Sequence, residues 1–170
     1  DKEAQKFAKE QVKASFKPLT ESQGKAFNAF AIMDLENSEY DLLLADVDAE
    51  DFSDSINAVT RAAAGGDITA DLINNTVLND RTRQAILSEL RWLEGALREE
   101  SGAAISPSEY ANKGAAFFPR SGDDSATIEK KRKARQRDTR GKYVKMGPAG
   151  KRQFKEEFEA EVQVKTTVED

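Results

Sequence analysis

The sequence predicts an all-α protein: an elongated segment of several helices whose packing is completed by oligomerisation. Three observations support this prediction. Apolar residues recur at helical spacing along most of the chain. Helix-capping motifs and Pro or Gly breaks divide it into separate segments. Only 38% of residues are hydrophobic and 34% are charged, so long polar faces separate short apolar ones, as in helices that share a core with neighbouring subunits.

Two helices are expected in the first part of the chain. From Lys2 to Phe16 the apolar residues are mostly three to five positions apart, and Pro18 then ends the helix. Residues 20–23 have the form of a capping box, in which a threonine and a glutamine satisfy each other's backbone N–H groups, so the second helix begins there. Its packing residues are Phe27 and Phe30.

The middle of the chain carries a weaker pattern. The helical stripe becomes indistinct near Asn37-Ser38 and resumes with Tyr40 and the leucines that follow. Phe52, Ile56 and Val59 return to helical spacing until Gly65-Gly66 interrupts the chain. Residues 67–78 fit either a short helix or an irregular segment. We therefore expect an N-terminal helical region with an acidic middle over residues 1–78.

The strongest helix is predicted from about Asp80 to Ser101, at the start of a second region over residues 79–170. Gly102 supplies the left-handed conformation that commonly ends a helix. Ser106 and Pro107 then restart the chain as N-cap and first-turn proline, with Glu109 completing a capping box. The result is a helix, a hinge and a second helix. The packing seam of the long helix consists of Ile86, Leu90, Leu93 and Leu97. We expect this seam, and the cluster of Phe7, Phe27 and Phe30, to be buried against sister subunits.

A turn, a basic helix and a C-terminal segment follow. Pro119 and Gly122 form the turn, and one of Asp123, Asp124 or Ser125 can cap the next helix. That helix is expected to end before Gly147-Pro148. The last segment carries Phe154, Phe158 and Val162 at helical spacing, although Val162, Val164 and the neighbouring threonines can also form a short strand.

The formal net charge of −5 conceals two opposed blocks. Residues 34–71 contain eleven acidic side chains and one arginine, whereas residues 129–142 are strongly basic. A basic helix can neutralise phosphates of a nucleic acid or dock onto an acidic region of a neighbouring subunit. The only aromatic residue of the basic segment is Tyr143, directly after Lys142. Stacking of nucleic-acid bases on aromatic side chains therefore has little support, and docking onto an acidic region of another subunit is favoured. The candidate contact residues are Lys130, Lys131, Arg132, Lys133, Arg135, Arg137, Arg140 and Lys142.

Composition excludes several classes of chemistry. The chain has no cysteine and no histidine, which excludes disulfides, thiolate nucleophiles, histidine bases and ordinary zinc sites. The acids of residues 46–50 lack the glycine and terminal glutamate of a calcium loop, and Gly65-Gly66 lacks the lysine of a phosphate-binding loop. No apolar run is long enough for a transmembrane helix. We expect no catalytic residue, no metal site and no cofactor.

Two stretches resemble a known group of proteins. Residues 19–27, LTESQGKAF, and residues 97–124, which include ESGAAISPSEY and FFPRSGDD before the basic helix, are similar in order and separation to the C-terminal region of tailed-phage virion proteins. Those proteins are described as DNA-ejection, internal or tail-associated proteins, and some are fused to a peptidoglycan lytic transglycosylase. Residues 37–79 match no motif of that group.

The resemblance implies a non-enzymatic virion component that assists DNA ejection across the host envelope. It implies a homo-oligomer, portal or tail proteins as partners, viral DNA as a further contact, and a segment of a longer chain. The alternative is the non-catalytic C-terminal part of a virion-associated lytic transglycosylase. Glu100-Ser101 matches the catalytic glutamate-serine of such enzymes, but the expected Gly-Leu-Met-Gln-like segment is replaced by residues 114–119, GAAFFP, so catalysis by Glu100 is not expected.

Overall fold

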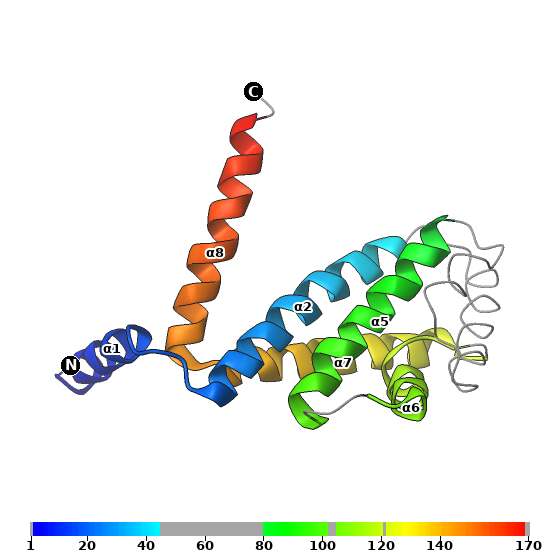
Figure 1. Ribbon diagram of the computed structural model, residues 1–170, viewed down its shortest axis with the longest axis horizontal. Coiled ribbons are helices and arrows are strands. Elements are labelled where there is room, and N and C mark those ends of the chain that lie inside the picture. The colour runs from blue at the N-terminus through cyan, green and yellow to red at the C-terminus, as the bar shows by residue number, and fades with distance from the viewer. Residues whose placement is uncertain (1, 45–79, 102–104, 121, 169–170) are drawn as a thin grey trace. The chain divides into compact units, whose positions relative to one another are not determined.

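The computed structural model describes residues 2–44, 80–101, 105–120 and 122–168, and these ranges contain six helices and no strand (Figure 1). The predicted all-α class is confirmed for the described chain. The expected helix at residues 52–59, the Gly65-Gly66 break, the segment 67–78 and Gly102 lie outside these ranges. The helices are α1 (Lys2–Ser15), α2 (Glu21–Leu44), α5 (Asp80–Ser101), α6 (Pro107–Phe117), α7 (Ser125–Lys145) and α8 (Gly147–Val168).

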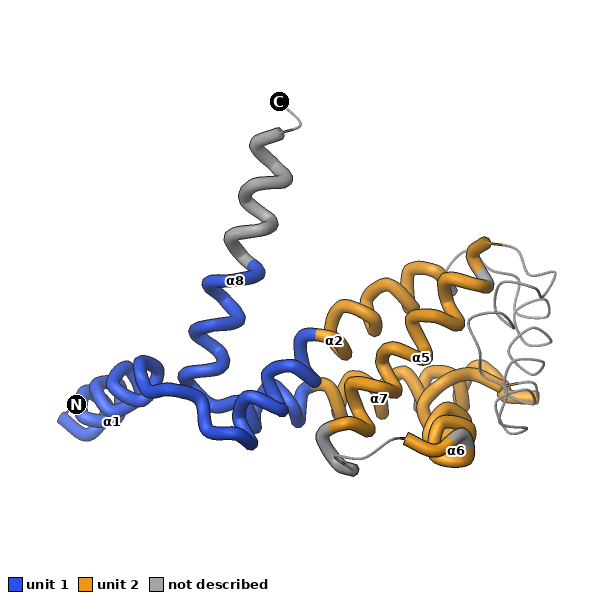
Figure 2. Tube along the Cα trace, viewed as in Figure 1, with its two compact units in different colours: residues 1–31, 140–170 blue, residues 32–139 orange. Residues whose placement is uncertain are grey.

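The chain divides into two compact units, shown in blue and orange in Figure 2. Unit 1 comprises residues 1–31 and 140–170, and unit 2 comprises residues 32–139. Helices α2 and α7 each contribute residues to both units. The sequence-based division at residue 78 falls among residues outside the described ranges, and the described helices group differently from it.

At the starts of α2, α6 and α7, a side chain accepts a hydrogen bond from a backbone N–H group of the first turn. At α2 the Gln23 N–H donates to Thr20 Oγ1 at 3.3 Å, and the Thr20 N–H donates to Gln23 Oε1 at 3.0 Å. At α6 the Glu109 N–H donates to Ser106 Oγ at 3.3 Å, and the Ser106 N–H donates to Glu109 Oε2 at 2.8 Å. Both predicted capping boxes are therefore confirmed.

The start of α7 resolves the choice between three candidate caps. Asp124 accepts from the Thr127 N–H at 2.7 Å and is the cap. Gly122 has a φ of +87°, a left-handed conformation that glycine adopts cheaply, and so provides the predicted turn after Pro119.

Helix α7 ends at Lys145, as expected before Gly147-Pro148. The chain then continues as α8 to Val168, so the residues around Val162 and Val164 are helical rather than a strand. Gly147 has a φ of +68° and starts α8 directly after the end of α7.

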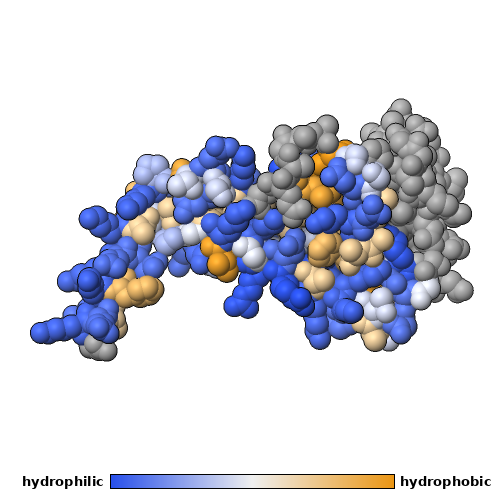
Figure 3. Space-filling model, turned by 90° about the horizontal axis from the view of Figure 1, so that it is seen from below, coloured by the Kyte–Doolittle hydropathy of each residue, from blue (hydrophilic) through white to orange (hydrophobic). Residues whose placement is uncertain are grey.

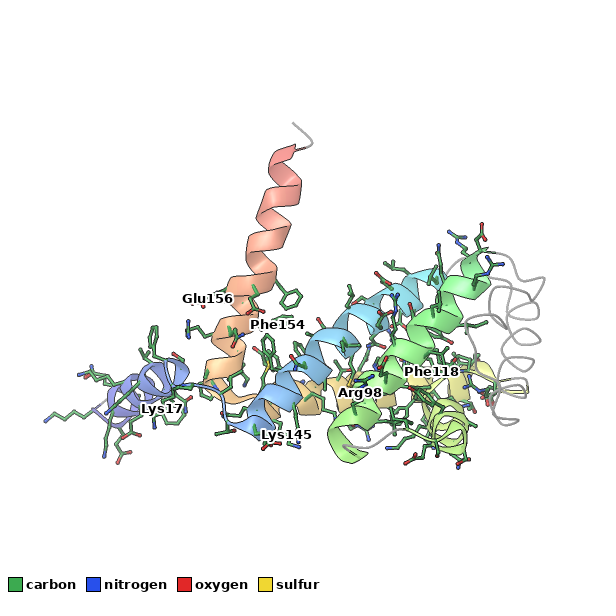
Figure 4. The ribbon with its side chains drawn as sticks, in the orientation of Figure 1. Lys17, Arg98, Phe118, Lys145, Phe154 and Glu156 are labelled. Atoms are coloured by element: carbon green, nitrogen blue, oxygen red, sulfur yellow. The ribbon has the colours of Figure 1, made fainter. Side chains whose placement is uncertain are left out.

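The core of unit 2 is formed by α5 packed with α7 and the second part of α2. Phe118 (labelled in Figure 4) and Trp92 are completely buried, with ring centroids 5.4 Å apart, and Tyr40 lies edge-on to Phe118 at 4.8 Å. The indole N–H of Trp92 donates to Thr139 Oγ1 at 3.3 Å, which satisfies its only polar group. The other described apolar residues buried in this unit include Met33, Ala85, Ile86, Leu93, Ala96 and Leu97.

Unit 1 has a smaller core, formed by α2 and α8. Phe27 and Phe30 are buried beside Met146. Phe154 of α8 packs on both phenylalanines, with centroid distances of 6.3 and 4.9 Å (Figure 4). Phe158, one turn later, stacks on Phe154 at 4.5 Å. The four-residue spacing of Phe154 and Phe158 therefore marks a packing face, as the sequence indicates.

Removal of the Ser106 cap is expected to cost about 1 kcal/mol of stability, because Ser106→Ala leaves the Glu109 N–H at the start of α6 without its side-chain acceptor. Urea unfolding followed by circular dichroism measures this change. Ser22→Ala, an exposed serine in the first turn of α2, is the matched control and is expected to change stability by less than about 0.5 kcal/mol. Equal effects of the two substitutions would contradict the assignment.

The same cap makes stability depend on pH. The hydrogen bonds from the Ser106 backbone and side chain lower the pKa of Glu109 below its ordinary value of 4.5. The ionised form is therefore favoured in the folded state, and its contribution is present above pH 4.5 and is lost as the pH falls through the lower folded-state pKa. Urea midpoints measured across this acidic range are expected to decline less steeply for Glu109→Gln than for the unsubstituted chain.

Candidate interaction surfaces

The basic helix α7 does not present all its cations to solvent. Arg135 is 1% exposed and lies inside unit 2. Its guanidinium donates to Asn37 Oδ1 at 3.0 Å, to Asp41 Oδ1 at 2.7 Å and to the Phe117 carbonyl at 2.7 Å. It also lies 4.9 Å from the ring centroid of Tyr40 and 4.8 Å from that of Phe118. Arg135 is thus a structural residue, since its donors are used within the chain and an external phosphate has no access to it.

A second cation, partly buried, lies in the turn between α6 and α7. The Arg120 guanidinium forms a two-point ion pair with the Glu89 carboxylate of α5 and donates to the Pro119 carbonyl at 2.8 Å. Burial raises the pKa of Glu89, while the positive charge of Arg120 acts in the opposite direction. The two hydrogen bonds from the Arg120 guanidinium to the Glu89 carboxylate fix the turn against α5.

Lys131 holds the same turn from α7. Its ammonium donates to Asp123 Oδ2 at 2.5 Å and to the Phe118 carbonyl at 3.1 Å. Asp123 in turn accepts from the Arg120 N–H at 2.8 Å. Within the motif FFPRSGD, Phe118 is therefore part of the core of unit 2, and Arg120 and Asp123 attach the turn to α5 and α7.

The remaining cations of the basic block differ in exposure. Arg132 pairs with Glu129 at 2.7 Å, and Lys133 approaches the same carboxylate at 3.5 Å. Lys142 is buried in unit 1. The hydrogen bond from Arg132 lowers the pKa of Glu129. The exposed members are Lys130, Lys133, Arg137 and Arg140, so the external basic face is smaller than the sequence indicates.

The predicted apolar seam packs within the chain. Ile86, Leu93 and Leu97 are buried in unit 2 and Leu90 is half-buried, whereas Phe27 and Phe30 are buried in unit 1. The expectation that these faces are buried by sister subunits is therefore wrong for these residues. The physical reason is that segments distant in sequence supply the partners, namely the turn at residues 117–120 in unit 2 and Met146 with Phe154 in unit 1, and a search along one helix cannot identify them. These side chains pack within the chain.

A different apolar surface remains open on unit 2. Leu42 of α2 is 73% exposed and Leu87 of α5 is 36% exposed. Both line a shallow groove with a volume of about 430 Å³, together with Leu43, Gln84 and Ser88. Glu39 and Arg91, which carry opposite charges, also line it, and Arg91 pairs with Glu36 at 3.5 Å. An apolar groove with one acid and one base among its lining residues is a surface on which another helix can pack.

Two sequence candidates cannot be placed. Gly102 and the side chain of Glu100 lie outside the described residues, so the hinge and the acid that resembles a transglycosylase residue are not located. Among the described residues no group of three or more acidic side chains is arranged to hold a metal ion. None of the described helices is long and apolar enough to cross a bilayer.

Glu89 and Asp41 are structural partners that sequence reasoning missed. A signal for Glu89 was present, because it lies three residues after Ile86 and four before Leu93, on the same helical face as the apolar seam. An acid on an apolar face indicates a buried charge that requires a cation. Asp41 carried no such signal, since it belongs to a long acidic block.

Comparison of the chain with protein families, with curated proteins and with solved structures finds no match.

Proposed function

We propose that the chain is a non-enzymatic structural component of a tailed-phage virion that acts by self-assembly and assists delivery of DNA across the host envelope. The resemblance of residues 19–27 and 97–124 to virion proteins supports the phage context. The second of these stretches supplies Phe118, Arg120 and Asp123 to the core of unit 2, so the shared motif has a role in folding that requires no catalysis.

The observation that carries the assembly proposal is the apolar groove between α2 and α5. Leu42 of α2 and Leu87 of α5 are exposed there, although Leu93 and Leu97 of α5 are buried. The groove has Glu39 on one helix and Arg91 on the other. In a twofold contact between two copies, the same patch meets itself, so Glu39 of one copy can face Arg91 of the next. A second copy of the chain is therefore the occupant we assign to this groove.

Light scattering coupled to size exclusion, at low and high salt, tests the assembly. The unsubstituted chain is expected to form a defined multimer, and the double variant Leu42→Lys, Leu87→Lys is expected to be monomeric while retaining its helical circular dichroism. Val144→Lys is the matched control, because Val144 is 63% exposed in α7 outside the groove, and it is expected to remain multimeric. A monomer of the unsubstituted chain at both salts contradicts self-assembly.

The virion context has a separate test. Antibody raised against the chain is expected to detect it in purified particles of the phage that encodes it. Particles that lack it are expected to adsorb to cells and to deliver less DNA. Normal DNA delivery by such particles would overturn the proposed role and leave the assembly result unaffected.

A further inference from the structure

Helix α1 is the one described helix for which no buried residue is found. Its apolar residues Ala4, Phe7, Ala8 and Val12 are spaced three, one and four apart, which places them along one broad side. Phe7 is 64% exposed and Val12 is 60% exposed. The helix therefore presents an apolar side to solvent that the packing of unit 1 does not use.

The opposite side of α1 is cationic. Lys2, Lys6, Lys9 and Lys13 are spaced four, three and four apart, which aligns them along the helix, and together with Gln5 and Glu10 they line one shallow groove. Residues 2–17 contain five lysines and two glutamates. This segment is thus positively charged in a chain with a net charge of −5. Figure 3 shows the helix at the left of the view as mainly hydrophilic, with a lighter apolar patch beside it.

The end of α1 is attached to unit 1. Arg152 of α8 donates from Nε to the Ser15 carbonyl at 2.9 Å, and its guanidinium lies 4.8 Å from the ring centroid of Phe16. This contact caps the last turn and leaves Phe7 and Val12 exposed. The helix is therefore held at one end while its two-sided surface stays accessible.

We propose that α1 is a binding site for an anionic lipid bilayer. A helix with an apolar side and a lysine-rich side lies in the plane of the bilayer interface, with its apolar side between headgroups and acyl chains. Lysines attract the negative surface, and their flexible stems let the ammonium groups reach headgroup phosphates. The charge of α1 is complementary to such a surface.

The size of the apolar side favours lipid over a protein partner. Stable protein interfaces bury about 800 Å² on each partner around well-packed large side chains. Among the residues of α1 only Phe7 and Val12 are large and apolar. A bilayer requires no complementary pocket, so two apolar side chains with lysines suffice for reversible binding. A nucleic acid would use the lysines and leave Phe7 in water.

Co-sedimentation of the full chain with vesicles tests this inference. Vesicles of equal parts phosphatidylglycerol and phosphatidylcholine are compared with vesicles of phosphatidylcholine alone. We expect at least about tenfold stronger partitioning to the anionic vesicles, and a loss of this difference at high salt, because salt screens charges near the surface. The double variant Phe7→Gln, Val12→Gln is expected to reduce partitioning by about tenfold or more.

Two matched controls separate α1 from other surfaces. Val144→Gln removes a similarly exposed apolar side chain from α7, outside the groove at Leu42 and Leu87, and Lys130→Gln with Lys133→Gln removes exposed charge from the same helix. Both are expected to bind vesicles as the unsubstituted chain does. Because α1 contributes no buried residue, the Phe7 and Val12 variant is expected to unfold at the same urea concentration as the unsubstituted chain.

Four outcomes overturn the proposal. The first three are absence of binding to anionic vesicles, retention of binding in the Phe7 and Val12 variant, and loss of binding in either α7 control. A fourth is a change in mass in solution caused by the Phe7 and Val12 variant without any vesicle binding, which would make α1 a protein interface. None of these results depends on the groove at Leu42 and Leu87, so the assembly proposal is tested separately.

Discussion

Substitution of Arg135 by methionine is expected to destabilise the protein by about 2–4 kcal/mol, because it removes the buried member of an ion pair whose other member, Asp41, is 29% exposed, and leaves the acceptors of Arg135 without their donor. Asp41, Asn37 and the Phe117 carbonyl each lose a donor at 2.7–3.0 Å. The guanidinium also lies over Tyr40 and Phe118, so its removal takes away packing as well as charge. Urea unfolding followed by Trp92 fluorescence measures the loss, since Trp92 lies in the same core.

Arg137→Met provides the matched control for this prediction. Arg137 is exposed on the same helix, and its replacement is expected to change stability by less than about 0.5 kcal/mol. Arg135→Lys is expected to be intermediate, because an ammonium keeps the charge but cannot serve three separated acceptors in the plane of a guanidinium. A stability loss for Arg137→Met as large as that for Arg135→Met would show that general charge, rather than the buried contacts, stabilises α7.

Replacement of Phe118 by alanine is expected to cost about 3–5 kcal/mol, the range for deleting a fully buried aromatic side chain. Phe118 contacts three of the largest buried side chains of unit 2, and its ring centroid lies 4.8 Å from that of Tyr40 and 5.4 Å from that of Trp92. The midpoint of urea unfolding and the emission maximum of Trp92 are expected to shift together, because the cavity opens next to the indole.

Phe7→Ala removes the same side chain from an exposed position on α1 and serves as the reference. In the absence of lipid it is expected to leave the midpoint within about 0.5 kcal/mol of the unsubstituted value. If Phe118→Ala costs as little as Phe7→Ala, the contacts of Phe118 do not determine the stability of unit 2.

Local features of the fold were predictable from the sequence. The bounds of α5, Asp80 and Ser101, agree with the expected helix, since its apolar seam is regular and long. The caps at Thr20 and Ser106 also agree, because a capping box depends only on residues three positions apart. Such features need no knowledge of the rest of the chain.

Non-local features were not predictable. Arg135 stands among seven other cations, and nothing in that run distinguishes the one that is buried. Its partners Asn37 and Asp41 lie 98 and 94 residues away, so their role depends on tertiary structure alone. The helical pattern weakens at Asn37 because this polar residue faces the core, where it accepts from Arg135; α2 is nevertheless continuous to Leu44. Tertiary contacts thus override local pattern at this point.

For the candidate surfaces, too, local features were predictable from the sequence and non-local ones were not. Composition correctly located a basic helix, but the open apolar groove at Leu42 and Leu87 was not expected. Leu87 adjoins the seam in sequence and differs from Ile86 only by one step of helical rotation. Which side of a helix is covered depends on the positions of α2 and α7, and periodicity along one helix does not provide this information.

The composition of the two units has a consequence for the order in which the chain folds. Unit 2 is continuous in sequence over residues 32–139, whereas unit 1 requires residues 1–31 and residues 140–170 together. During synthesis from the N-terminus, unit 2 is complete before the second half of unit 1 has been made. Phe27 and Phe30 can therefore be buried only after their packing partners Met146 and Phe154 have been synthesised. By then the folding of unit 2 has brought the segments on either side of it, residues 1–31 and 140–170, closer together. The entropic cost of joining these two segments is therefore lower when unit 1 forms.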